Sequence, residues 1–251
     1  MSEHPPDSAG ETVDAFYRGR VQLIQSKKGF RFAIDAPLLA DFVETRPEDE
    51  LCELGTGNGV IAVLLSLKPW KHLTAVEIQP SLADLARRNV ALNGLESRIE
   101  IVEADFRIWR PGRRFDIVLS NPPYIRKRTG FLSASAEKSI AKHEIACDIG
   151  EVMRAAAALL NPDGRAFFVY PAPRENDLRA AIAAAGLNPR TIRRVLPRPG
   201  APPVLILVEA GICGEAPKDS PAERVMAPLI LRDELGADTP EAQQIYEGRQ
   251  S

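Results

Sequence analysis

The sequence predicts an α/β protein built around a doubly wound, mostly parallel β-sheet. Three observations support this fold class. The composition is ordinary for a globular chain, with 45% hydrophobic and 26% charged residues. From residue 51 onward, short apolar segments alternate with amphipathic segments of helical length. No apolar run reaches the ~18 residues that a membrane span needs. These observations exclude wholly disordered, collagenous and coiled-coil proteins, and no membrane partner is expected.

Seven apolar segments are expected to form the strands of this sheet. They occupy residues 51–54, 73–78, 99–104, 115–120, 165–170, 191–196 and 203–209. Helices are expected between them at residues 60–67, 81–93, 149–160 and 173–185. Strands separated by helices indicate βαβ units and a parallel sheet. No helix separates the last two strands, so we expect a terminal hairpin that leaves one antiparallel strand at the sheet edge. Residues 228–231 are compatible with a further short edge strand.

A small N-terminal unit is expected before the sheet. Residues 1–14 are acidic, contain proline and lack apolar periodicity, which is typical of a disordered tail. Residues 15–45 are predicted to hold a β-hairpin, with strands at 21–25 and 30–34, and a helix for which Asp35 is the N-cap. The sheet domain then spans 46–211, and a polar extension follows at 212–251.

Charge and cysteine usage restrict the partners and the compartment. The formal net charge is −2, but residues 16–214 carry 28 bases against 22 acids, because both ends of the chain are acidic. Such a body is compatible with a phosphate-bearing partner, although an ordinary solvated surface explains it as well. Three widely spaced cysteines and the lack of a secretory signal predict a reducing cytoplasm. The three histidines form no metal-binding pattern, so no metal is expected. The oligomeric state stays open.

A glycine-rich turn follows the first strand of the sheet. Glycines stand at the alternate positions 55, 57 and 59, directly before a helix, which permits positive φ angles and close approach of a ligand to the backbone. A dinucleotide loop would need glycine where Val60 stands, and a P-loop would need GK[ST]. The turn instead resembles the S-adenosylmethionine loop, in which a carboxylate in the place of Glu53 serves the ammonium group of the ligand. The alternative is a tight turn that requires small residues.

Acidic residues end the next two strands. A carboxylate at Glu77, followed by Ile78, is able to accept both hydroxyls of a ribose. A carboxylate at Asp105 is able to accept from the amine of an adenine, with Phe106 lining the ring. Each acid taken alone has a plainer explanation as a solvent-facing or turn-forming residue. Because the carboxyl ends of parallel strands share one edge of a sheet, we expect these side chains to converge with the glycine turn.

The fourth strand ends in Asn121-Pro122-Pro123-Tyr124. Prolines directly after a strand end the ladder, since they lack the N–H group, and they stiffen the exit. This exit presents two hydrogen-bond acceptors to a planar amine, namely the Asn121 side-chain oxygen and the Pro122 carbonyl. The Tyr124 ring is then able to stack on the plane of the group that carries the amine. The plainer interpretation is a rigid strand exit without a ligand.

These motifs at these spacings resemble class I S-adenosylmethionine-dependent amino-methyltransferases. Across residues 29–210 the chain resembles the small-domain methyltransferase family. Residues 29–39 and 228–231, with Ile245 and Tyr246, are similar to its YfiC-like branch, which includes tRNA(Val) adenine-N6 methyltransferases. The resemblance implies a Rossmann-like seven-stranded methyltransferase sheet and S-adenosyl-L-methionine as cofactor. It implies a cofactor site of Asp35, Glu53, Gly55, Thr56, Gly57, Asn58, Gly59, Glu77, Ile78, Asp105, Phe106 and Asn121. It implies a catalytic set of Asn121, Pro122, Pro123 and Tyr124.

The acceptor is expected to be the exocyclic N6 of an adenine in tRNA or another structured RNA. Basic residues flank the expected base pocket, and they predict phosphate contacts, although solvated loop charges explain them as well. They are Lys27, Lys28 and Arg31 on one side and Arg126, Lys127 and Arg128 on the other. Two alternatives stay open: a glutamine N5-methyltransferase that acts on a protein, and a nucleic-acid-binding module whose methylase site is inactive.

Overall fold

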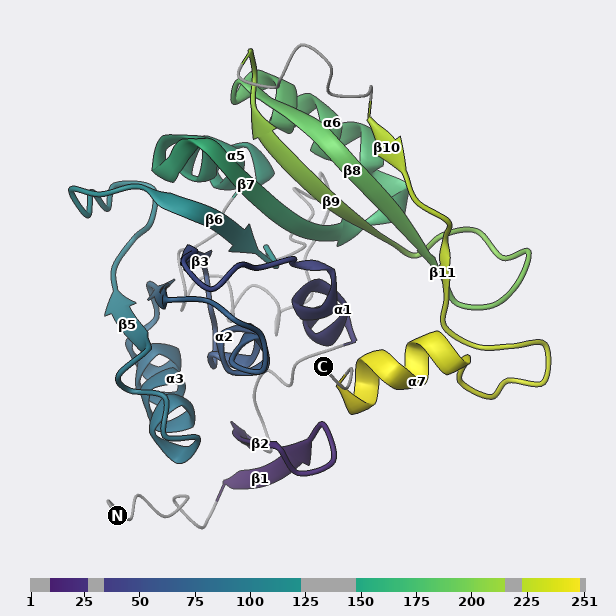
Figure 1. Ribbon diagram of the computed structural model, residues 1–251, viewed down its shortest axis with the longest axis horizontal. Coiled ribbons are helices and arrows are strands. Elements are labelled where there is room, and N and C mark those ends of the chain that lie inside the picture. The colour runs from purple at the N-terminus through teal and green to yellow at the C-terminus, as the bar shows by residue number, and fades with distance from the viewer. Residues whose placement is uncertain (1–9, 27–33, 123–147, 215–222, 249–251) are drawn as a thin grey trace, which may run out of the picture.

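The computed structural model describes residues 10–26, 34–122, 148–214 and 223–248 of the chain. Within them, helices cover both faces of a central sheet of nine strands (Figure 1). The strands are β3 (Glu50–Leu54), β4 (His72–Glu77), β5 (Ile99–Glu103), β6 (Phe115–Ser120), β7 (Leu160–Pro171), β8 (Leu187–Leu196), β9 (Leu205–Ile212), β10 (Arg224–Val225) and β11 (Leu229–Ile230). Their order is β10-β8-β9-β7-β6-β3-β4-β5, and β11 also pairs with β8. The predicted α/β fold with seven main strands is confirmed, as is the short strand expected at 228–231.

The position expected for the antiparallel strand is wrong. β9 pairs antiparallel with both β7 and β8, so it lies inside the sheet and not at its edge. The connection from β7 to β8 passes over the sheet through α6 (Glu175–Ala184) and leaves one place vacant between them. The chain then returns directly into that place as β9. Because this strand is covered on both faces, it carries a continuous buried run over residues 206–208.

Side chains alternate between two cores, one on each face of the sheet. In β6, Ile117 and Leu119 belong to the core on one face, and Val118 belongs to the core on the other. The first face is covered by α1 (Asp35–Phe42), α2 (Val60–Leu65) and α3 (Pro80–Leu92), and the second by α5 (Ile149–Leu159) and α6 (Figure 1). The short helix η1 (Ala172–Arg174) directly precedes α6. This alternation follows from the period-two geometry of strands.

The ends of two helices differ from the expectation. The spacing of Ser81 and Asp84 predicts a capping box for α3, but the helix begins at Pro80 with Gln79 as its N-cap, and no side chain caps it. Proline at the first helical position sets the start instead, because its fixed φ suits a helix and its missing N–H costs nothing there. Asp35 is the first residue of α1 and not its N-cap.

The N-terminal hairpin is present, but its strands are not the expected pair. β2 (Val21–Ser26) pairs with β1 (Glu11–Phe16), which overlaps the tail that was expected to be disordered through residue 14. The partner expected at 30–34 lies outside the described residues apart from Ile34, which forms a turn. Glu11, one of the acids that suggested a tail, pairs with Arg88 at 2.6 Å.

The polar extension is folded against the body of the protein. Its helix α7 (Pro240–Glu247) packs Ala242 and Ile245 into the core beneath α1. The Arg20 guanidinium in the hairpin turn donates to the backbone oxygens of Glu247 at 3.1 Å and Gly248 at 2.7 Å. The turn of the N-terminal hairpin therefore meets the end of α7 (Figure 1). Among the residues that the structure describes, no helix has the length and apolar character that a membrane crossing requires.

Candidate functional site

The carboxyl ends of four neighbouring strands lie at one edge of the sheet. The backbone N–H groups of Gly55 and Thr56 donate to the Val76 carbonyl at 2.9 and 3.1 Å, which ties the end of β3 to the end of β4. On the other side of β3, the Ser120 hydroxyl donates to the Leu54 carbonyl at 2.7 Å. The residues that follow β3, β4 and β6 are therefore neighbours, as expected from the sequence.

The glycine turn has an open part and a packed part. Gly55 and Gly57 adopt φ angles of 72° and 61°, and a Cβ atom at either position would meet no atom within 4 Å. Gly59, with φ 80°, is packed against α3, since a Cβ atom there would lie 3.2 Å from the Cβ of Ala86. The first two glycines leave space for a ligand, whereas the third lets the turn and α3 pack closely.

Glu77 fixes the shape of the glycine turn. One carboxylate oxygen accepts from the Gly57 N–H at 2.8 Å, and the other accepts from the Gln79 N–H at 2.9 Å. The side chain is only 4% exposed. Ile78 follows it at the end of β4 and is half-buried. The predicted proximity of Glu77 to the glycine turn is therefore present, and a ribose would meet a carboxylate that is already oriented by two amides.

Glu53 is buried at the base of the same turn. Its carboxylate accepts from the Thr56 hydroxyl at 2.7 Å. Burial is the main cause that raises the pKa of this carboxyl to about 8; hydrogen bonds from Thr56 and the Ala62 backbone oppose the rise, and Glu77 adds to it. At neutral pH the group is therefore mostly protonated.

Asn58 has a buried side chain whose polar atoms are unsatisfied. It is 1% exposed, and neither its Oδ1 nor its Nδ2 has a hydrogen-bond partner in the described part of the chain. Its backbone oxygen accepts from the Nδ2 of Asn89 at 2.8 Å. Buried polar groups without partners are rare in folded proteins, and they are often explained by a ligand or a bound water.

Asp105 has a partner that the sequence analysis missed. Its carboxylate accepts from Nε and Nη2 of Arg107, with a shortest distance of 2.7 Å, and these hydrogen bonds hold the pKa of Asp105 below its usual range. An adenine amine would share this carboxylate with the guanidinium. Phe106 is half-buried and packs on the core beneath α5 and α6. An arginine two residues after a strand-end aspartate is the sequence signal that would have indicated the pair.

Asn121 and Pro122 are the described residues of the predicted catalytic motif. Asn121 directly follows β6, is half-buried and stands beside the end of β3, while Pro122 is buried. Asp35 is buried at the start of α1, where its carboxylate accepts from the Ala36 N–H at 3.2 Å. The remaining predicted residues lie outside the described residues. They are Pro123, Tyr124, Lys27, Lys28, Arg31, Arg126, Lys127 and Arg128.

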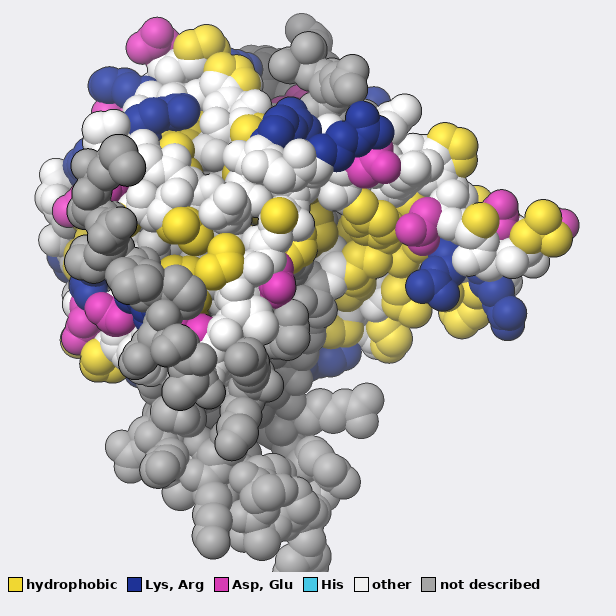
Figure 2. Space-filling model, turned by 90° about the horizontal axis from the view of Figure 1, so that it is seen from below, with side chains coloured by type: hydrophobic (Ala, Val, Ile, Leu, Met, Phe, Trp, Pro, Cys, Tyr) yellow, Lys and Arg dark blue, Asp and Glu magenta, His cyan; other side chains and the backbone are white. Residues whose placement is uncertain are grey.

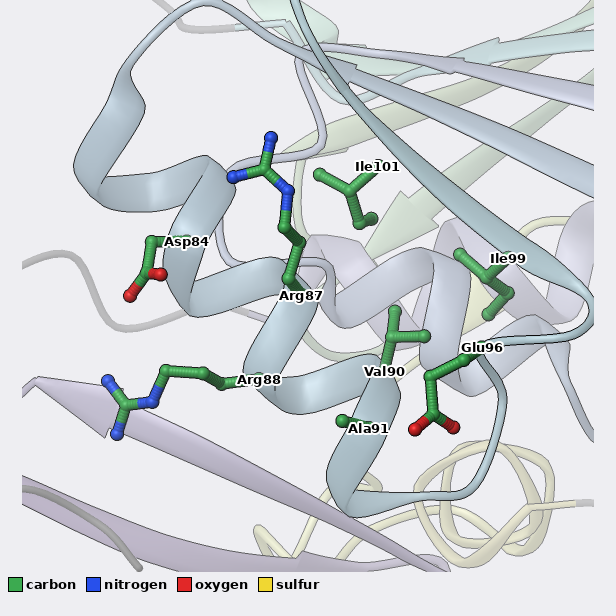
Figure 3. A pocket seen from close by; sticks show the side chains of 8 residues that line it. All are labelled: Asp84, Arg87, Arg88, Val90, Ala91, Glu96, Ile99 and Ile101. Carbon is green, nitrogen blue, oxygen red and sulfur yellow. The ribbon is translucent and has the colours of Figure 1, made fainter. Parts of the chain in front are cut away.

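A cavity of about 510 Å³ lies elsewhere, between α3 and β5 (Figure 3). Its floor is apolar and includes Ile99 and Ile101. Two arginines at its rim are engaged in ion pairs, Arg88 with Glu11 at 2.6 Å and Arg87 with an acid of β5 at 3.7 Å. None of the predicted site residues lines this cavity, so the candidate site is the sheet edge and not this space. Among the described residues no group of three potential metal ligands occurs.

Three comparisons show which known proteins the chain is similar to. The model of the methyltransferase small domain family matches residues 31–178. The chain is 26% identical over 185 residues to a tRNA1(Val) (adenine(37)-N6)-methyltransferase of Bacteroides fragilis, covering 72% of this chain and 77% of that protein. It is 28% identical over 207 residues to the enzyme of the same name from Porphyromonas gingivalis, covering 78% and 80%. The fold is similar to that of a predicted O-methyltransferase from Agrobacterium tumefaciens, with a TM-score of 0.64, 24% identity, and coverage of 86% and 97%.

Proposed function

The chain belongs to the methyltransferase small domain family, and on this basis we propose that it methylates the exocyclic N6 of an adenine in tRNA, with S-adenosylmethionine as the methyl donor. The names of its curated relatives support the acceptor. One structural observation supports the chemistry most directly: the Ser120–Leu54 hydrogen bond brings the exit of β6, with Asn121, beside the glycine turn. A tRNA substrate would place the protein in the cytoplasm.

The residues of the sheet edge fit S-adenosylmethionine. Open space over Gly55 and Gly57 admits a ligand against the backbone, and the carboxamide of Asn58 is buried without a partner among the described residues. The residues that would hold the cofactor are the glycine turn, Glu77 with Ile78, and Asp105 with Phe106. When bound, S-adenosylmethionine supplies an electrophilic methyl group on a sulfonium.

Asn121 and Pro122 would orient the acceptor amine. An adenine amine is a poor nucleophile because its lone pair is delocalised into the ring. If the Asn121 side-chain oxygen and the Pro122 carbonyl each accept a hydrogen bond from one N–H of the amine, the nitrogen becomes pyramidal. Its lone pair is then directed out of the ring plane. Acceptors held in place before the reaction stabilise the positive charge that develops on nitrogen. No strong base is needed beforehand, because the proton becomes acidic only as the new bond forms.

Replacing Asn121 by alanine tests this proposal. We expect Asn121→Ala to raise the barrier by about 3 kcal/mol, roughly a hundredfold or more in turnover, by analogy with the loss of one preorganised hydrogen-bond partner. Turnover is measured by mass spectrometry of nucleosides from unmodified tRNA treated with labelled methyl donor. Asn161→Ala is a matched control, since that carboxamide donates to Asp116 away from the site edge, at 2.8 Å.

The outcomes separate the parts of the proposal. Near wild-type turnover by Asn121→Ala would contradict the role of Asn121. Label found on a protein glutamine, and none on RNA, would contradict the acceptor and leave methyl transfer in place. Wild-type protein that binds no S-adenosylmethionine in calorimetry would contradict the enzymatic function itself.

A further inference from the structure

Two asparagines of α3 bind the backbone of the N-terminal hairpin. Asn89 Oδ1 accepts from the Ile24 N–H at 2.6 Å, and its Nδ2 donates to the Ile24 carbonyl at 3.2 Å. One helical turn later, Asn93 Oδ1 accepts from the Gln22 N–H at 2.9 Å, and its Nδ2 donates to the Gln22 carbonyl at 2.7 Å. The two carboxamides thus pair with alternate residues of β2, as the backbone of a neighbouring strand would.

The two carboxamides differ in the use of their second N–H group. Asn93 donates it to the Asn89 carbonyl of its own helix at 2.7 Å. Asn89 donates it to the Asn58 carbonyl in the glycine turn at 2.8 Å. Asn89 is 0% exposed, so water does not compete for these hydrogen bonds. One buried side chain therefore joins the hairpin to the glycine turn.

The hydrogen bond to Asn58 acts on the peptide that directly follows the open part of the turn. The peptide between Asn58 and Gly59 is held from both sides, since the Asn58 oxygen accepts from Asn89 and the Gly59 N–H donates to the Thr56 carbonyl at 3.0 Å. Rotation of this peptide would move Gly57, whose N–H is held by Glu77 at 2.8 Å. Loss of the Asn89 hydrogen bond would leave a buried carbonyl unpaired and allow the turn to relax.

We propose that Asn89 is a positioning residue that couples the seating of the N-terminal hairpin to the affinity of the glycine turn for S-adenosylmethionine. The inference rests on the proposed function for the identity of the ligand. Because coupling is reciprocal, the cofactor also holds the hairpin in place.

The test compares Asn89→Ala with Asn93→Ala. Both variants lose a two-bond pair with β2, but only the first loses a hydrogen bond to the glycine turn. Calorimetry with S-adenosylmethionine is expected to give a Kd about tenfold weaker for Asn89→Ala, within the usual range of coupling between sites. Asn93→Ala is expected to stay within twofold of the wild type, although both variants should be destabilised in thermal unfolding.

Hydrogen exchange gives a second measurement. If Asn89 had only a structural role, the cofactor would not alter the exchange rates of the hairpin amides. In the wild type, S-adenosylmethionine is expected to slow exchange of the Ile24 and Gln22 amides, and in Asn89→Ala this protection is lost. Equal Kd values for the two variants would overturn the inference and leave the proposed function intact. If Asn89→Ala does not fold, wild-type hairpin amides that exchange equally with and without cofactor would overturn it. A wild type that binds no S-adenosylmethionine would overturn the proposed function first.

Discussion

Glu53 is a buried acid whose protonation ties stability to pH. Its pKa in the folded chain is about 8, against 4.5 for an ordinary glutamate. Between these values the unfolded chain loses the proton while the folded chain retains it, so this group makes the folded state less stable as pH rises from about 4.5 to about 8. Glu53→Gln stays neutral, and its free energy of unfolding relative to wild type should therefore rise with pH, by at most about 1.4 kcal/mol per pH unit.

Urea unfolding at a series of pH values measures this difference. Glu96→Gln, at an exposed glutamate, is the control and should follow the wild-type curve. A constant difference between wild type and Glu53→Gln across the range would contradict the raised pKa. If Glu53 also serves the ammonium group of the cofactor, the wild-type Kd should tighten as pH rises toward 8, because the ion pair requires the carboxylate.

Two glycines of the turn are expected to respond differently to the same substitution. Gly59→Ala adds a Cβ atom 3.2 Å from Ala86 at a φ of 80°, so strain and crowding should lower the free energy of unfolding by about 2 kcal/mol or more. Gly57→Ala meets no atom within 4 Å and should cost only about 1 kcal/mol of strain. The new methyl group stands in the ligand space, however, so Gly57→Ala should weaken cofactor binding more than its stability loss explains. Urea unfolding and calorimetry on both variants separate the two effects.

At the scale of elements, one ion pair attaches the C-terminal helix to the sheet. The Arg193 guanidinium of β8 contacts both carboxylate oxygens of Glu241 in α7 at 2.8 Å, and its Nε donates to the Ala227 carbonyl at 3.1 Å. The arginine side chain is 10% exposed and the glutamate side chain 42%. Arg193→Ala should therefore cost about 2 kcal/mol in unfolding free energy, between the values of exposed and buried pairs.

A neighbouring pair offers the control for this prediction. Arg232 lies 3.8 Å from Asp238, and both side chains are largely exposed. Arg232→Ala should change the free energy of unfolding by less than about 0.5 kcal/mol. Chemical unfolding of the two variants measures the difference, and faster amide exchange confined to α7 in Arg193→Ala would show which element is released. Equal losses in both variants would contradict the role assigned to Arg193.

At the scale of the whole molecule, charge should govern the binding of RNA. On the face shown in Figure 2, the Lys and Arg side chains of the described residues lie in separate groups with acids nearby, and not in one continuous patch. The sequence predicts phosphate contacts at Arg126, Lys127 and Arg128. Replacing these three by alanine should reduce the slope of log affinity against log salt by about two, since each phosphate contact contributes roughly 0.7 to 0.9.

Filter binding with tRNA at several salt concentrations measures this slope. Alanine at the exposed Arg110 and Arg198 is the control and should leave the slope unchanged. An affinity that does not depend on salt in the wild type would contradict phosphate contacts altogether. A slope that is unchanged in the triple variant would place the contacts elsewhere.

The fold could be predicted from the sequence because strands and helices alternate with clear periodicity. The position of β9 could not be predicted. The crossover from β7 through α6 to β8 leaves space for one strand between them, and the strand pattern of the sequence does not show which crossover does so. β1 was also missed. Its acids are typical of a disordered tail. The partner of Glu11 is Arg88, which lies far along the chain, so the sequence pattern around β1 does not indicate it.

The candidate site could be predicted as far as residue types at strand ends determine it. Glu77 and the glycine turn meet as expected, because parallel strands place their carboxyl ends together. Partners within the site were harder to predict. Arg107 donates to the Asp105 carboxylate from two residues further along the chain. Asn89 donates to the glycine turn from the buried face of α3, where polar residues are rarely expected.

The contact of Arg20 with the carbonyls that end α7 joins positions 227 residues apart. During synthesis, β1 and β2 leave the ribosome well before α3 and long before α7. Until α2 and α3 have followed, the apolar side chains of Val21 and Leu23 lack core partners that those helices supply. We therefore expect the hairpin to be the first segment made and among the last to settle, with a nascent chain stalled before Pro240 presenting it to chaperones.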